Sequence, residues 1–176
     1  RTYTFTYTGC EGNGHDWTYT YTIEYDDFDM PSDGSSTVAC ASEISAPTLP
    51  EVTDACGNAL TGVLKTGYPT ETPSCEGTVV YKYTFTDCEG NGHDWTYTYT
   101  IEYDDFDMPS DGSSTVACAS EISAPTLPDV TDACGNALTG ELKSGYPTET
   151  PACNGDVTYV YTFTDCKGNA HDWTYT

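Results

Sequence analysis

A 78-residue unit recurs along this chain, and it constrains the fold more than any other feature of the sequence. The motif Cys-x-Gly-Asn-x-His-Asp-Trp-Thr-Tyr-Thr begins at Cys10, Cys88 and Cys166. Residues 26–98 and 104–176 align without a gap, and only 10 of those 73 positions differ. The unit is longer than the roughly 20–50 residues of solenoid repeats, and it can bury a small core of its own. The period therefore predicts a tandem array of small domains.

The period also divides the chain into three parts. We expect residues 1–25 to be the C-terminal part of a preceding repeat and residues 26–103 to be one complete repeat domain. Residues 104–176 are then the next repeat domain without its last residues. No Gly/Ser tract separates the two complete copies, so a flexible tether is not expected. The joint therefore predicts an extended, fairly stiff rod, with Phe106 and Met108 packed at the seam between domains.

Four cysteines in each complete repeat predict disulfides, because small domains with thin cores need such staples and secreted domains carry them. Zinc is the competing interpretation, but no Cys-x-x-Cys pair occurs and each repeat has one His. Residues between Cys75 and Cys88 alternate as a single strand. At roughly 3.3 Å per residue that strand holds its ends much farther apart than the about 7 Å a disulfide spans. This excludes Cys75–Cys88 and, with it, Cys40–Cys56.

Two pairing schemes remain for each repeat. The favoured scheme and its copy join Cys40–Cys88, Cys56–Cys75, Cys118–Cys166 and Cys134–Cys153. The alternative scheme joins Cys40–Cys75 and Cys56–Cys88. In both, the ninth cysteine, Cys10, is expected to pair upstream of this chain.

Charge narrows the range of partners. The net charge is −23 with only five Lys and Arg, so there is no basic patch for nucleic acid or anionic lipid. No apolar run approaches membrane-spanning length. We therefore expect no nucleic-acid partner and no membrane insertion in this segment. The acidity is typical of a soluble domain in a crowded surface protein.

Strand patterns dominate the repeat. Residues 79–86 and 93–103 each alternate aromatic or β-branched residues with polar ones, which is typical of half-buried antiparallel strands. The turn-like sequence between them predicts a hairpin. Shorter strands are expected around 36–40, 50–53 and 60–65, and no amphipathic helix is expected. The fold class is therefore all-β: tandem small immunoglobulin-like β-sandwich domains, stapled by disulfides.

Acidic residues gather where one repeat meets the next. Hard carboxylate oxygens suit Ca²⁺, which takes 6–8 oxygen ligands, and Ca²⁺ bridging two domains would stiffen a rod. A solvated acidic turn is the alternative, and no EF-hand loop is present. Ca²⁺ is the only cofactor that the sequence suggests. The candidate ligands are Glu24, Asp26, Asp27, Asp29, Asp33, Glu102, Asp104, Asp105, Asp107 and Asp111.

Each copy of the repeated motif also contains an adjacent His-Asp pair, as in His93-Asp94. Adjacent residues in a strand point to opposite faces, so the pair cannot act as an oriented catalytic dyad. No nucleophile motif or phosphate-binding loop accompanies it. We therefore predict no catalytic residue and no enzymatic activity. Trp95 and its copies are expected in the core rather than as sugar-stacking platforms.

Several motifs together resemble a known kind of repeat: Tyr-Thr-Phe-Thr-Asp-Cys-Glu-Gly-Asn, His-Asp-Trp-Thr-Tyr-Thr-Tyr-Thr-Ile-Glu, Ser-Thr-Val-Ala-Cys-Ala and Val-Thr-Asp-Ala-Cys-Gly-Asn. They are similar to the repeats of giant gliding-motility adhesins of the SprB type and, more distantly, to HYR-type immunoglobulin-like modules. Many HYR modules carry a cysteine after the Gly-Asn, where this chain has Trp95, so HYR disulfide pairings are not transferred. The resemblance implies a filamentous protein on gliding bacteria, exported by type IX secretion and gripping polysaccharide or a solid substratum.

The sequence thus favours a structural stalk segment of a secreted surface adhesin, located extracellularly at the cell surface. Its partners would be the neighbouring repeats of the same chain and, by the resemblance, the gliding and secretion machinery. Two alternatives stay open. Each repeat is itself a polysaccharide-binding module acting by avidity, or the repeats associate laterally into an extracellular filament.

Overall fold

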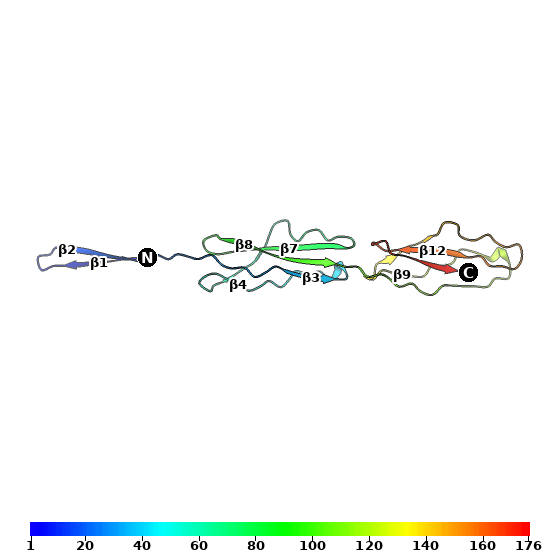
Figure 1. Ribbon diagram of the computed structural model, residues 1–176, viewed down its shortest axis with the longest axis horizontal. Helices are drawn as coiled ribbons and strands as arrows, with labels where there is room; N and C mark the ends of the chain where they lie inside the picture. Colours follow the sequence, from blue (N-terminus) through cyan, green and yellow to red (C-terminus); the bar gives the residue numbers. More distant parts are fainter.

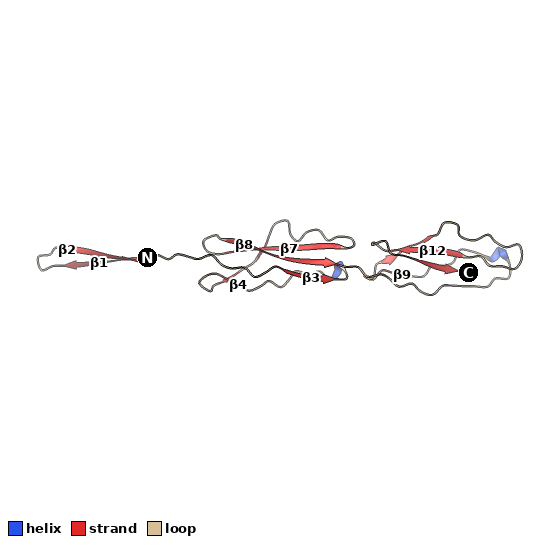
Figure 2. Ribbon diagram, viewed as in Figure 1, coloured by secondary structure: helices blue, strands red, loops and turns tan.

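Strands and loops make up almost all of the computed structural model, which describes residues 1–176. A hairpin with strands between Thr2 and Thr20, a first domain with strands between Gly34 and Ile101, and a second with strands between Val130 and Tyr175 follow one another along its long axis (Figure 1). Two three-residue 3-10 turns, η1 (Ala41–Glu43) and η2 (Ala119–Glu121), are the only helical segments (Figure 2). No helix here has the length and apolar character needed to cross a membrane. The chain is all-β, as predicted.

The first domain contains a four-stranded and a two-stranded sheet. In the larger sheet β3 pairs parallel with β8, whereas β8–β7 and β7–β6 are antiparallel. The second sheet is the short antiparallel pair β4–β5. These strands are β3 (Gly34–Val38), β4 (Val52–Thr53), β5 (Ala59–Leu60), β6 (Val63–Leu64), β7 (Gly77–Thr86) and β8 (Gly92–Ile101).

The predicted hairpin is the central element of that sheet. β7 and β8 pair over ten residues, from Gly77 opposite Ile101 to Thr86 opposite Gly92. The expected inner face is the buried one: Phe85 is 1% and Trp95 5% exposed. The alternation therefore assigned this face correctly.

The outer face differs from expectation at one point. Val160, which replaces Lys82 of the first copy, is buried rather than exposed. The loop before the equivalent strand of the second domain covers this position, because Thr148 hydrogen-bonds in both directions with the backbone of Thr158, as Thr70 does with that of Val80 in the first domain. In addition, the ammonium of Lys82 lies 5.4 Å from the ring centre of Tyr68. This loop therefore covers part of a face that we expected to be solvent-exposed.

The core lies between the hairpin and the segments that precede it. Phe28, Val52, Tyr83, Phe85 and Trp95 form its buried cluster. The segment before β3 is fixed along β8 by two bonds: the Trp95 indole N–H donates to the Ser32 carbonyl (3.0 Å), and the Thr96 amide donates to Asp33 (2.8 Å). The first residues of each repeat therefore complete that repeat's own core.

The second domain repeats this arrangement. Its strands are β9 (Val130–Thr131), β10 (Ala137–Leu138), β11 (Gly140–Leu142), β12 (Tyr159–Thr164) and β13 (Ala170–Tyr175). A parallel bridge from Gly112 to Tyr175 stands where β3 pairs with β8 in the first domain. Phe106 lies in the buried cluster with Val130, Phe163 and Trp173, and Met108 packs against it. The prediction that Phe106 and Met108 pack at the seam is therefore wrong.

The N-terminal hairpin consists of β1 (Thr2–Thr8) and β2 (Gly14–Thr20), which pair as β7 and β8 do. Its aromatic side chains are exposed: Trp17 is 52% exposed, against 5% for its copy Trp95. No counterparts of Phe28 and Val52 cover it. The contrast shows that the core of a repeat requires both its halves.

Candidate functional site: the joint between repeats

Two turns of the same design close one end of the first domain. Each has the sequence Asp-x-x-Gly-Asn, beginning at Asp54 between β4 and β5 and at Asp87 between β7 and β8. Asp54 accepts hydrogen bonds from the Cys56 amide (2.9 Å), the Asn58 amide (2.8 Å) and the Asn58 side chain (2.9 Å). Gly57 adopts a φ of 83°, in the left-handed region that favours glycine. Each turn is thus rigidly built around one carboxylate, and each carries a cysteine.

The cysteines of these two turns lie together. Cys56 and Cys88 both contact the hydroxyl of Tyr25, and hydrogen bonds to Cys56 and then to Cys88 raise the pKa of Tyr25 to about 12. Both cysteines are free and exposed. The end of the domain that faces the N-terminal hairpin therefore presents two thiols.

The other two cysteines of the domain lie at its opposite end. Cys40 follows β3, and Cys75 precedes β7. Because Val38 of β3 and Gly77 of β7 both pair with Ile101 at the end of β8, the two cysteines lie beyond the same end of the sheet. Figure 1 shows that β3 points toward the second domain here.

Disulfides at this end cross to the next repeat. Cys40 is bonded to Cys134 and Cys75 to Cys166, with Cα–Cα distances of 5.6 and 5.7 Å, which is the usual range for a disulfide. The partners Cys134 and Cys166 are the copies of Cys56 and Cys88, in the two Asp-x-x-Gly-Asn turns of the second domain. The joint between repeats is therefore closed by the backbone and by two disulfides.

The favoured pairing within each repeat is wrong. Cys40 lies beyond the Ile101 end of β8, whereas Cys88 precedes its Gly92 end. Ten residues of strand separate these ends by about 33 Å, and a disulfide spans about 7 Å. The structure therefore contains none of the predicted bonds Cys40–Cys88, Cys56–Cys75, Cys118–Cys166 and Cys134–Cys153. The alternative joined cysteines of the same end, but Cys40 and Cys75 bond across the joint instead, and Cys56 and Cys88 are free.

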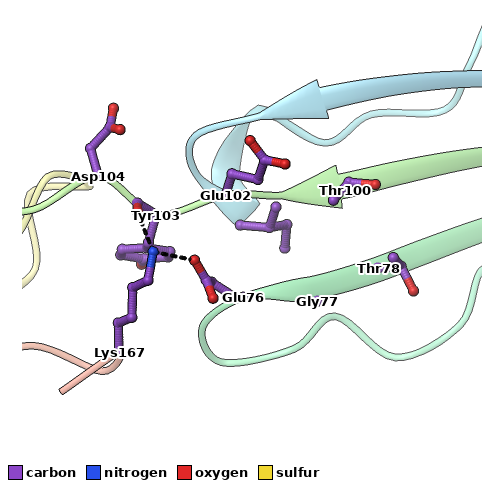
Figure 3. A pocket seen from close by; sticks show the side chains of 9 residues that line it. Glu76, Gly77, Thr78, Thr100, Glu102, Tyr103, Asp104 and Lys167 are labelled. Atoms are coloured by element: carbon purple, nitrogen blue, oxygen red, sulfur yellow. Dashed lines mark hydrogen bonds and ion pairs between the residues drawn. The ribbon is translucent and has the colours of Figure 1, made fainter.

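Polar contacts reinforce the joint beside the second disulfide. Lys167 follows Cys166, and its ammonium lies 2.6 Å from a carboxylate oxygen of Glu76, which follows Cys75. The same ammonium donates to the Tyr103 carbonyl at 3.2 Å (Figure 3). Tyr103, the last residue of the first repeat, is 8% exposed, and its hydroxyl accepts a bond from Asn136 (3.4 Å). Each disulfide of the joint therefore has polar contacts close to it.

The two residues of this ion pair differ from their copies in the neighbouring repeats. Glu76 is replaced by Asn154 in the next copy, and Lys167 replaces Glu89 of the preceding one. These are two of the few differences between copies, and here they meet. Together with Glu102 and Asp104 they line a cleft of about 520 Å³, shown in Figure 3. The hydrogen bond that the Lys167 ammonium donates to the Glu76 carboxylate raises the pKa of this ammonium.

The junction carboxylates that we considered as calcium ligands make different contacts from one another and do not converge on one point. Asp33 accepts the Thr96 amide, and Asp111 accepts the Thr174 amide. Glu102 and Asp104 line the cleft. No three acidic, histidine or cysteine side chains are arranged to hold a metal ion. Ca²⁺ binding at the junctions therefore stays a prediction, without a preformed site to support it.

Two further carboxylates of that set pair with histidines. Asp27 lies 2.9 Å from Nε2 of His93, and Asp105 makes the same contact with His171. The hydrogen bond from His93 lowers the pKa of Asp27. His93 also packs edge-on against Phe28, whereas Asp94 on the other face binds Lys65 and Thr84. The adjacent His-Asp residues therefore point to opposite faces, as predicted, and each fastens a different segment to β8.

The fold and the joint together define a class: all-β, immunoglobulin-like modules linked by disulfides, of the kind found in extracellular proteins. The chain matches the family profile of the HYR-like domain with 4 cysteines over residues 1–23, 28–101 and 106–176. It therefore belongs to that family, and the HYR-like resemblance is confirmed. Among curated proteins, none shows significant similarity to the chain.

One signal in the sequence pointed to the joint and was overlooked. The Asp-x-x-Gly-Asn pattern occurs twice in each repeat, and both copies contain a cysteine. Two turns of one design in a small sandwich, each at the end of a hairpin, indicate that Cys56 and Cys88 share one end. The remaining pair then falls to the other end, which excludes Cys40–Cys88 and Cys56–Cys75.

Proposed function

We propose that this chain is a stalk segment of a giant secreted cell-surface adhesin of the SprB type, acting in bacterial gliding motility and surface attachment. Each additional repeat lengthens the stalk, and the stalk projects a distal adhesive region from the cell. The observation that carries this proposal is the pair of disulfides between consecutive repeats. A module that worked alone as a binding domain would not need covalent bonds to its neighbour.

The joint supports a stiff arrangement. Tyr103 and Asp104 connect the domains without a linker, and the two disulfides start beyond the ends of two different strands, β3 and β7. Three covalent connections at separate points restrict bending and twisting more than one backbone connection does. A net charge of −23 keeps neighbouring filaments apart by repulsion. Export by a type IX system and contact with the gliding machinery are part of the proposal through the resemblance.

The exposed aromatic row of the N-terminal hairpin does not favour the polysaccharide-binding alternative. Its members are Tyr3, Phe5, Trp17, Tyr19 and Tyr21. Their counterparts in the complete repeat include Tyr83, Trp95 and Tyr99, each less than 10% exposed. In a complete repeat these three rings are buried and the other two, Tyr81 and Tyr97, pack half-buried against the core, which leaves little sugar-stacking surface.

Antibodies against the 176-residue chain test the proposal. On intact, moving cells of the source bacterium, we expect the antibodies to label filaments outside the cell and to slow gliding. Labelling that requires permeabilised cells would refute a surface stalk. A parallel measurement on agar beads addresses the alternative: retention of the purified chain would mean that the repeats bind polysaccharide themselves.

A further inference from the structure

The two disulfides obey a rule that accounts for every other cysteine of the chain. Their sequence separations are 94 and 91 residues. Each joins a cysteine at the trailing end of one repeat to one in a turn of the next. Under the same separations, Cys118 and Cys153 would bond to a following repeat, and Cys56, Cys88 and Cys10 to preceding ones. These five are the free cysteines, and all five are exposed.

The second disulfide continues into an extended strand. Cys166 lies at the leading end of the second domain and Cys153 at its trailing end, with β12 between them. In the first domain, β7 likewise runs between Cys88 and Cys75. One strand in each repeat thus spans the domain and has a cysteine near each end. Figure 2 places η2, which follows Cys118, at the outer end of the second domain, away from the joint.

We propose that these strands and disulfides form a continuous covalent cable through the array, so that pulling force bypasses most of each repeat. This inference rests on the proposed stalk function. The cable runs from Cys88 along β7 to Cys75, crosses the disulfide to Cys166, and continues along β12 to Cys153. The partner of Cys153 is the fourth cysteine of the following repeat, in its Asp-x-x-Gly-Asn turn.

Each disulfide of the cable forms by oxidation of two thiols. Two thiols lose two protons and two electrons as the S–S bond forms, and a disulfide of the thiol-oxidoreductase class accepts them and becomes a dithiol. Both partners lie at exposed domain ends, where such an oxidant has access. The acceptor turns are rigid, so the sulfur is held in position when the next domain docks.

The cable limits extension. Cys166 lies 13 positions after Cys153 in the sequence, and 13 residue steps span about 43 Å as a strand and at most about 47 Å when fully stretched. A 78-residue repeat without disulfides stretches to about 280 Å. Unfolding the rest of a repeat therefore adds almost no length to an oxidised array, because its force-carrying strand is already extended.

The native thiols allow a direct test in the chain itself. Cys10→Ser, Cys56→Ser and Cys118→Ser leave Cys88 and Cys153 as the free thiols for attaching handles through thioether bonds, at the points where neighbouring repeats would pull. Single-molecule force extension then gives the unfolded length. We expect about 100 Å in the oxidised protein, from two 13-residue strands and one disulfide, and about 230 Å after reduction, from 65 residues of backbone.

Two matched variants separate the joint's disulfides. Cys75→Ser combined with Cys166→Ser should give the long extension without reductant, whereas Cys40→Ser combined with Cys134→Ser should keep the short one. An oxidised protein that extends to about 230 Å, or a variant without Cys75 and Cys166 that stays at about 100 Å, overturns the cable. Neither result touches the surface-labelling test, so failure of the cable and failure of the stalk are distinguishable.

A second arm tests whether the rule extends along the array. A copy of residues 99–176 placed after Thr176 preserves the 78-residue period. After oxidation with glutathione disulfide, peptide mapping should show Cys118 bonded to the added copy of Cys134 and Cys153 bonded to the added copy of Cys166. Alkylation of Cys118 and Cys153 as free thiols would confine the cable to the present joint and refute its continuity.

Discussion

Two single variants, each lacking one of two equivalent cysteines, distinguish the observed pairing from any pairing within a repeat. Cys40 and Cys118 are copies of each other, but only Cys40 has its partner in this chain. With Cys75–Cys166 intact, the bond Cys40–Cys134 closes a loop of about 70 residues. The loop-closure relation then assigns this bond about 4 kcal/mol of stability at 25 °C. Cys40→Ser should lose this contribution, and Cys118→Ser should leave stability within about 0.5 kcal/mol.

Urea unfolding followed by tryptophan fluorescence, with free thiols alkylated, measures the difference. For a slope of roughly 2 kcal/mol per molar urea, the midpoint of Cys40→Ser should fall by about 2 M. The midpoint of Cys118→Ser should stay with that of the parent protein. Equal losses in the two variants would indicate bonds within each repeat, and no loss in Cys40→Ser would show that the bond across the joint does not form. Either result refutes the reasoning.

Three other perturbations test the core, the joint and the acidic turns. Trp95→Ala should cost about 3–5 kcal/mol of unfolding free energy because the indole is buried, whereas Trp17→Ala, at an exposed copy, should cost little; thermal melts of the two variants decide. Lys167→Glu places like charges side by side with Glu76, so the disulfide between the neighbouring cysteines should form more slowly in oxidative refolding, and 0.5 M NaCl should reduce the difference; equal rates at low salt would contradict this role. Hydrogen bonds from the turn hold the pKa of Asp54 below its ordinary 3.8. The ionised carboxylate therefore stabilises the fold above pH 3.8, and this stabilisation is lost as the pH falls through the lowered pKa of the folded protein. Between about pH 5 and pH 2.5, the urea midpoint of Asp54→Asn should therefore change less than that of the parent protein.

The sequence predicted the parts of the fold that depend on local pattern. Alternating aromatic residues in 79–86 and 93–103 identified the hairpin and its buried face, because the period of a strand is a property of neighbouring residues. The pairing of β3 with β8 is parallel and joins residues more than 60 positions apart. Nothing in the short run from Gly34 to Val38 shows which end of the sheet it will reach.

That missing direction is why the disulfides were predicted wrongly. The strand argument excluded a bond between Cys75 and Cys88, and it would also have excluded Cys40–Cys88 had the direction of β3 been known. Treating each repeat as self-contained then left only partners inside it. The calcium hypothesis for the acidic junction arose for a related reason. Asp27 and Asp33 are close in sequence, but their side chains bind His93 and Thr96 of β8 in their own domain.

The overlap of the two disulfides also decides what a protease can do to this protein. Cys40–Cys134 encloses one stretch of backbone and Cys75–Cys166 another, and the two stretches overlap between Cys75 and Cys134. A single peptide-bond cut anywhere from Cys40 to Cys166 therefore leaves both pieces joined by at least one S–S bond. An array in which every joint carried both bonds would stay in one piece even with one cut in each repeat.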